Sequence, residues 1–464
     1  MKRKVLLGVL IGLLIFSAGT SFAACKNTMA LFTAYKAKRL CSDVFISMRD
    51  PEIIQSQDLA AVRAFPAIID YAGKAVTVTF QGKIRKRAIY REGCGCTLVN
   101  YATEEEVLNQ ARVYVEPRPR HPQNVPWPTG DLTPKAELPA GVDKVKLAEA
   151  MDKAFSEPDP KKPRRTRAVV VVYKGRIIAE RYASGFSQST PLLGWSMTKS
   201  VTNALIGILV GQGRLLIQEP ASVPEWSGAD DPRRSITLDQ LLRMSSGLKF
   251  IEEYTKNSDA TCMLFGTHDT AAYAASQPLE TEPDSKWSYS SGTANILSRI
   301  VRGAVGGTSA DYFAFPRQAL FNRIGMRSAI MEPDASGTFV GSSFMYATAR
   351  DWARFGLLYL QDGVWEGTRI LPEGWVDYSR RPTPKAPQGR YGAQFWLNAG
   401  NPSDETKRPM PLLPTDLFFA SGFEGQSVTI IPSKKLVAVR LGLSQAKGAW
   451  NLEEFLADVL KAIP

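Results

Sequence analysis

The sequence predicts an α+β fold, in which a β-sheet sandwiched by helices receives a helical subdomain inserted between its first and last strands. A hairpin pattern covers residues 167–183, with strand-like runs on either side of a turn at Lys174-Gly175. Strand patterns return at 426–431 and 435–441, and helical patterns fill the interval at 238–244, 294–302 and 349–361. A sheet built from both ends of the domain follows from this order.

The first 24 residues predict a bacterial-type secretory signal peptide. Lys2, Arg3 and Lys4 precede an apolar run over 5–16 and a small-residue segment over 17–24. An uncleaved membrane anchor is the alternative, and the small residues favour cleavage. We therefore expect an exported, periplasmic protein. Membrane contact is expected only through the signal or through lipidation of Cys25, which follows an imperfect lipobox with Phe22 in place of an aliphatic residue.

Three further segments follow the signal. Residues 25–115 form an N-terminal extension, with a predicted helix over 27–40 and a strand over 75–80. Residues 116–140 are a Pro-rich linker. Residues 141–464 are compact and globular, opening with a helix over 142–155 and closing with one over 451–462.

Four of the five cysteines, Cys25, Cys41, Cys94 and Cys96, lie in the first hundred residues, and Cys262 stands apart. An exported chain favours disulfides. Cys94 and Cys96 are too close to pair with each other. Cys41 is therefore expected to pair with one of them. We favour Cys96, because it begins an apolar run that is easily buried. Three alternatives are left for Cys25, which is either lipidated, free or paired with the remaining cysteine.

Composition argues against several other functions. The chain has only two histidines, neither at ligand spacing, so we expect neither metal nor cofactor. The net charge is +12, but the densest basic run, 161–167, contains no aromatic residue and is typical of a solvated loop. We expect no nucleic-acid partner. The oligomeric state is not predicted.

The segment 196–199 (Ser-Met-Thr-Lys) carries the chemistry. Ser196 and Lys199 share one face of a predicted apolar helix over 196–210 that stops at Gly211. Burial pushes a lysine toward its neutral form, which can take the proton of a serine hydroxyl. Of two other Ser-x-x-Lys matches, the one at 246–249 contains a Gly in a predicted loop, and the one at 444–447 runs directly into Gly448 near the end of the sequence. The pair therefore predicts an acyl-transfer hydrolase.

Two later segments add possible partners. Tyr289, in Tyr289-Ser290-Ser291, precedes a helix, and its phenol could relay protons if a neighbouring lysine charge lowers its pKa. Residues 420–422 (Ala-Ser-Gly) precede a strand, and Gly422 allows close backbone approach to a ligand. Alone, the first is an ordinary buried tyrosine and the second a Gly-rich turn.

Together, in this order, the three motifs resemble those of the serine β-lactamase and penicillin-binding-protein superfamily. The resemblance covers about 140–464. It is strongest to the class C-like branch and to serine hydrolases like 6-aminohexanoate-dimer (nylon oligomer) hydrolase. Segments 236–248 and 347–356 are also similar to that branch. The resemblance implies a β-lactamase/transpeptidase-like fold.

The resemblance also implies roles for individual residues. Ser196 would be the nucleophile, Lys199 the base and Tyr289 the proton relay. The backbone N–H groups of Ser196 and Phe423 would form the oxyanion hole. The remaining residues implied to bind or line the substrate are Ser291, Ser421, Gly422 and Tyr254.

The sequence departs from the family at Ala420, where β-lactamases and D,D-peptidases carry a Lys or His that binds the substrate carboxylate. We therefore predict a secreted serine hydrolase of small amides or esters. A β-lactamase or D,D-peptidase and a non-catalytic penicillin-binding-type module are the alternatives. A Ser-His-Asp α/β-hydrolase is poorly supported, because only His121, in the linker, and His268 are available.

Overall fold

The computed structural model describes residues 27–110, 124–133, 138–401, 404 and 407–464. The predicted signal peptide over 1–24, Cys25, and 116–123 and 134–137 of the predicted linker lie outside these residues. In the described ranges, no helix combines the length and the apolar character needed to cross a membrane.

The central sheet has six antiparallel strands, in the order β12-β13-β14-β15-β5-β6. Its strands are β5 (Thr166–Tyr173), β6 (Arg176–Tyr182), β12 (Trp396–Leu397), β13 (Phe418–Gly422), β14 (Gln426–Ile431) and β15 (Leu436–Gly442). Strand β15 pairs with β5, for example Val439 with Val170, so the two ends of the domain join in one sheet. The predicted α+β class, with a sheet built from both ends of the domain, is confirmed.

Strand β5 shows why the sheet is covered on both faces. Alternate side chains point to opposite faces of a strand. Val169 and Val171 belong to one hydrophobic cluster, whereas Val170 and Val172 belong to another, and all are fully buried. Helices α5 (Lys144–Phe155) and α14 (Leu452–Lys461) cover the first face. Helix α12 (Ala349–Leu360) packs on the other.

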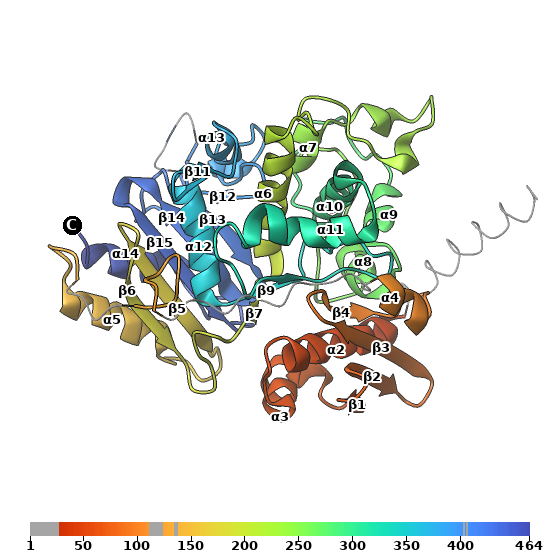
Figure 1. The fold of residues 1–464 in the computed structure, drawn as a ribbon, viewed down its shortest axis with the longest axis horizontal. Coiled ribbons are helices and arrows are strands. Elements are labelled where there is room, and N and C mark those ends of the chain that lie inside the picture. Colours follow the sequence, from red (N-terminus) through yellow and green to blue (C-terminus); the bar gives the residue numbers. More distant parts are fainter. Residues whose placement is uncertain (1–26, 111–123, 134–137, 402–403, 405–406) are drawn as a thin grey trace, which may run out of the picture.

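A helical subdomain occupies the middle of the chain and lies to the right of the sheet in Figure 1. Helix α6 (Thr198–Gly211) runs between the two parts and contacts α10. The other helices of this subdomain are α7 (Leu238–Leu242), α8 (Asp259–Gly266), α9 (Thr270–Ala275), α10 (Ser291–Val305) and α11 (Ser309–Pro316). Helix α13 (Trp375–Ser379) lies above the sheet in Figure 1. Two small sheets lie outside the central one. They consist of β7 (Leu192–Leu193), β8 (Ile330–Met331) and β9 (Met345–Ala347), and of β10 (Val364–Trp365) and β11 (Thr368–Arg369).

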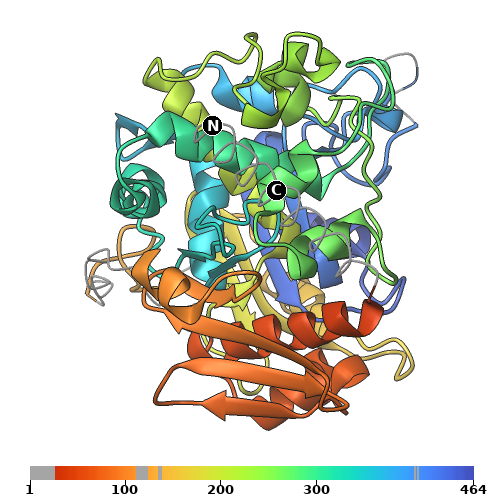
Figure 2. The same ribbon diagram turned by 90° about the vertical axis from the view of Figure 1, so that its right-hand side faces the viewer.

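Residues 27–110 form a separate α/β layer, here called the N-terminal unit, drawn in red and orange in Figures 1 and 2. Helix α2 (Thr28–Phe45) packs on a four-stranded antiparallel sheet. The unit's other elements are β1 (Ala67–Asp70), β2 (Ala75–Phe80), β3 (Ile84–Arg91), β4 (Gly95–Leu98), α3 (Pro51–Ile53) and α4 (Glu104–Gln110). Cys41 and Cys96 form the predicted disulfide between α2 and β4, whereas Cys94 is buried and free.

The N-terminal unit packs on the hydrolase-like domain (138–464) below its helices, as Figure 2 shows. Both parts contribute to one hydrophobic core, in which Leu40 of α2 and Phe265 of α8 are members. Buried polar contacts also join them. Lys38 forms an ion pair with Glu332, and the Tyr346 hydroxyl donates to Asp43 at 3.1 Å. The two units therefore share one interior.

Residues 124–133 of the predicted linker pack on α12. The Arg354 guanidinium donates to the backbone oxygens of Pro128 at 2.7 Å and Gly130 at 2.6 Å. Arg350, one turn earlier, donates to the backbone oxygen of Asp131 at 2.7 Å. These charged hydrogen bonds hold this part of the chain against the domain.

Candidate active site

The helix predicted to begin at Ser196 begins two residues later, at Thr198, and Ser196 itself lies in the 3-10 turn Trp195–Met197 immediately before α6. Trp195 has a φ of 48°, a left-handed conformation that costs a non-glycine residue free energy. Its ring is held in place, because the indole N–H donates to the buried Glu424 carboxylate at 3.0 Å. A packed, strained residue thus fixes the backbone at the serine, while Ser196 itself is partly exposed.

Lys199 follows Ser196 by one helical turn and is 1% exposed. Its Nζ donates to Ser196 Oγ at 3.1 Å, to Ser291 Oγ at 2.9 Å and to the Ser342 backbone oxygen at 3.0 Å. Burial lowers the pKa of Lys199 to about 8, and the Glu252 carboxylate opposes this with a smaller rise. With this pKa, roughly a tenth of Lys199 is neutral at pH 7 and about half at pH 8.

Tyr289 lies beside Ser196 and Lys199, but its pKa is shifted in the direction opposite to the predicted one. Its ring packs edge-on against Tyr391, and Lys199 Nζ lies 4.9 Å from the ring centroid. Burial, followed by the Glu252 charge, raises the pKa of Tyr289, and its hydrogen bond with Ser196 lowers it less. The expectation that a lysine charge lowers this pKa is therefore wrong. Tyr289 stays a protonated phenol that can donate.

Glu252 is a site residue that the sequence analysis did not single out. It accepts hydrogen bonds from the Ser291 backbone N–H at 2.7 Å and from Ser291 Oγ at 2.6 Å. The Tyr254 hydroxyl donates to the same carboxylate and contacts Ser291 Oγ at 3.1 Å. One carboxylate thus orients two polar side chains beside Lys199. Its proximity to Tyr254 in the sequence was the only signal, because the loop carries no motif.

The third motif approaches the serine through its backbone. A Cβ at Gly422 would lie 2.1 Å from the Gly194 backbone oxygen, so only glycine fits there. This contact places the end of β13, with Ser421, and the Phe423 backbone beside the turn that carries Ser196.

Ala420, where the resemblance leads us to expect a cation, lies on β13. It is 1% exposed and packs in the hydrophobic core. The end of β13 therefore offers no charge for a substrate carboxylate at this position.

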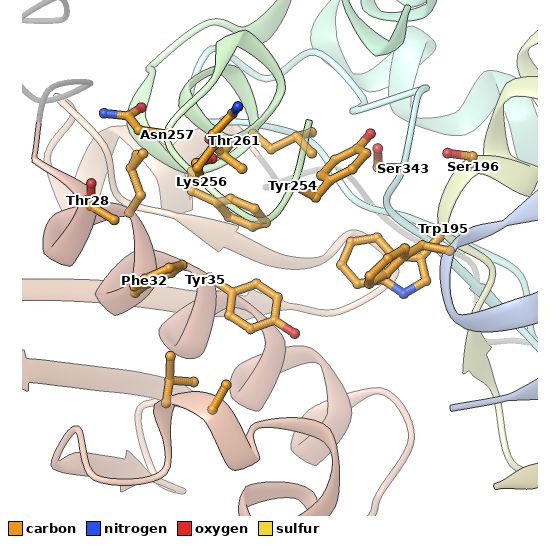
Figure 3. A pocket seen from close by; sticks show the side chains of 16 residues that line it. Thr28, Phe32, Tyr35, Trp195, Ser196, Tyr254, Lys256, Asn257, Thr261 and Ser343 are labelled. Carbon is orange, nitrogen blue, oxygen red and sulfur yellow. The ribbon is translucent and has the colours of Figure 1, made fainter. Parts of the chain in front are cut away.

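Ser196 opens into a cavity of about 230 Å³ that both units line. Figure 3 shows Tyr254, Ser343 and Trp195 between the serine and the N-terminal unit. His268 does not line this cavity, and its Nδ1 lies 3.1 Å from the Asn100 backbone oxygen. Within the described ranges, no group of three or more His, Cys, Asp or Glu side chains could hold a metal ion.

Comparison with known proteins identifies a family for this chain. Residues 150–448 match the family model described as Beta-lactamase. A 6-aminohexanoate-dimer hydrolase of Paenarthrobacter ureafaciens is 25% identical over 304 residues, which cover 60% of this chain and 72% of that relative.

Solved structures share the fold, and with the family match they confirm the predicted β-lactamase/transpeptidase-like fold. A candidate 6-aminohexanoate-dimer hydrolase from Bacillus anthracis superposes with a TM-score of 0.54 at 24% identity, covering 68% of this chain and 83% of that one. A family VIII carboxylesterase gives a TM-score of 0.51 at 16% identity, covering 68% and 96%.

Proposed function

The chain belongs to the Beta-lactamase family of serine hydrolase-type enzymes, and from this premise we propose that it cleaves small esters or amides through an acyl-enzyme on Ser196. The observation that carries the proposal is the contact of Lys199 Nζ with Ser196 Oγ at 3.1 Å. Together with a pKa lowered to about 8, that contact makes Lys199 a base for the serine.

The reaction then follows from the arrangement of the side chains. Neutral Lys199 takes the Ser196 proton as Oγ attacks the substrate carbonyl carbon. The backbone N–H groups of Ser196 and Phe423 stabilise the oxyanion. Tyr289 donates its proton to the leaving oxygen or nitrogen as the scissile bond breaks, and recovers one from Lys199.

Deacylation repeats these steps with water as the nucleophile. Water loses its proton to the same base and attacks the acyl carbonyl, and Ser196 Oγ leaves with a proton. Ser291, held by Glu252 and by Lys199, keeps the Lys199 ammonium oriented in both half-reactions. Tyr254, which contacts Ser291 Oγ and lines the cavity, borders the substrate.

The buried Ala420 favours esters and linear amides over β-lactams and cell-wall peptides as substrates. The P. ureafaciens relative, named for hydrolysis of the 6-aminohexanoate dimer, supports this choice. We further propose that the enzyme acts after export to the periplasm. The signal-like residues 1–24 support export, and the Cys41–Cys96 disulfide fits an oxidising compartment.

A fluorophosphonate probe tests the nucleophile. We expect labelling of the wild type and of Ser343→Ala, a neighbouring serine that also lines the cavity, and none of Ser196→Ala. Labelling of Ser196→Ala at the wild-type rate would refute the assignment. Turnover of p-nitrophenyl acetate and the 6-aminohexanoate dimer should exceed that of a chromogenic cephalosporin, and the reverse order would refute the substrate class.

A further inference from the structure

We propose that the cavity between the N-terminal unit and the hydrolase-like domain is an acyl pocket that selects medium-length apolar acyl chains. The inference rests on the proposed function and names its substrate class. The enzyme would then prefer esters or amides of acids with roughly eight carbon atoms over those of acetic acid.

The first support is the chemistry of the wall. The N-terminal unit contributes Leu31, Phe32 and Val62, and the hydrolase-like domain contributes Trp195, Leu264 and Phe423. Figure 3 shows Phe32 and Tyr35 of α2 facing the space that ends at Ser196. An apolar cavity attached to a nucleophile favours an apolar substituent on the carbonyl carbon.

The volume of the cavity sets the length of the acyl chain that it can hold. An apolar cavity of 150 Å³ accepts benzene, a six-carbon ring. By proportion, the cavity of about 230 Å³ accepts roughly nine carbon atoms. Each methylene transferred from water into such a wall is worth roughly a fourfold gain in kcat/KM. The gain should stop when the cavity is full.

The position of the proton-transfer residues assigns the cavity to the acyl side. Lys199 and Tyr289 do not line it. Tyr289, the proposed donor to the leaving group, lies instead among Trp396 and Tyr391. The leaving group therefore departs on that side, and the acyl group that stays on Ser196 extends toward the N-terminal unit.

The N-terminal unit is a fixed wall of this pocket. Asp58 accepts two hydrogen bonds from Arg167 of β5, at 2.8 and 2.7 Å. The Arg39 guanidinium lies 5.0 Å from the Trp195 ring centroid, directly beside the nucleophile. A wall anchored by buried charges holds one shape, as chain-length selection requires.

The test uses p-nitrophenyl esters from acetate to dodecanoate with the full chain. We expect kcat/KM to rise to about eight acyl carbons and then fall. Ala61 is exposed on its turn and lines the cavity, so Ala61→Phe fills the pocket without disturbing the core. We expect the ratio of kcat/KM for the octanoate to kcat/KM for the acetate to fall more than about tenfold. Ala60→Phe, on the same exposed turn but outside the cavity, is the matched control and should match wild type.

A second readout does not depend on turnover. p-Nitrophenyl octanoate should bind the Ser196→Ala variant, and adding Ala61→Phe should weaken that binding more than about tenfold, whereas adding Ala60→Phe should not. A flat chain-length profile with active acetate hydrolysis, or equal effects of the two substitutions, would overturn the pocket alone. No Ser196-dependent turnover of any ester or amide would overturn the proposed function, and octanoate binding would still decide the pocket.

Discussion

The interior of the hydrolase-like domain and its junction with the N-terminal unit are stabilised by different kinds of contact. The central sheet of the domain is apolar on both faces, as the alternating valines of β5 show. The junction with the N-terminal unit adds buried charges: Asp58 with Arg49 and Arg167, and Lys38 with Glu332. Apolar burial is non-directional, whereas paired charges demand one geometry. The paired charges therefore hold the N-terminal unit in one fixed orientation beside Ser196.

The largest expected effect is the loss of activity when the proposed base is removed, which does not involve the junction between the two units. Lys199→Ala removes the proposed base, so kcat/KM for p-nitrophenyl acetate should fall roughly 10²–10⁴-fold. Lys249, which also follows a serine by three residues but is exposed and lies outside the cavity, is the control, and Lys249→Ala should leave acetate hydrolysis unchanged. A fall of less than about tenfold in Lys199→Ala would mean that another group takes the proton.

The next effect concerns the junction. Asp58→Ala leaves three buried arginines, Arg39, Arg49 and Arg167, without their shared carboxylate. The free energy of unfolding, from urea denaturation, should fall by about 3–5 kcal/mol. Asp230→Ala, at an exposed position, should stay within about 0.5 kcal/mol of wild type.

The pH dependence of that loss has a definite sign. Arg167 and Arg49 hold the pKa of Asp58 well below its ordinary value. A carboxylate with a lowered pKa stabilises the fold at all pH values above its unfolded pKa, and loses this only as pH falls toward the lowered value. The difference between wild type and Asp58→Ala should therefore be constant from pH 7 to about pH 5. A difference that shrinks over this interval would contradict the ionised, paired state.

Removal of the disulfide in the N-terminal unit should lower the free energy of unfolding by a comparable amount. The Cys41–Cys96 disulfide spans a sequence separation of 55, for which the loop-entropy model gives about 4 kcal/mol. The double variant Cys41→Ala/Cys96→Ala should lose about this much stability by urea denaturation. Cys94→Ala, which removes a buried free thiol, should lose about 1 kcal/mol. Equal losses would show that the disulfide adds nothing beyond packing.

The smallest effect probes the coupling of Glu252 to Lys199. Since the base must be neutral, kcat/KM should rise with pH and reach half its maximum near pH 8. Glu252 raises the pKa of Lys199, so Glu252→Gln should move this midpoint to lower pH. Glu253 instead accepts a hydrogen bond from Thr255 Oγ at 2.7 Å, so Glu253→Gln should leave the midpoint of the pH profile unchanged. A shift to higher pH in Glu252→Gln would contradict the electrostatic coupling.

Local patterns predicted much of the fold. The strand over 75–80 and the hairpin around Lys174-Gly175 coincide with β2 and β5–β6, and the helix over 349–361 coincides with α12. These segments were predictable because their apolar periodicity matches the geometry of one element. Strands β1, β3 and β4 were not predicted. The sequence of β3 is rich in Arg and Lys, and its pairing with β2 and β4 decides its structure.

For the site, the sequence by itself determined the spacing of Ser196 and Lys199, because one helical turn sets that distance. It also determined the pairing partner of Cys41 up to a choice between two neighbours. Only the tertiary structure brought Glu252 to Ser291, raised the pKa of Tyr289 and set α2 beside Trp195. Burial, charge and cavity shape depend on segments far apart in the chain, and no local pattern encodes which of them will meet.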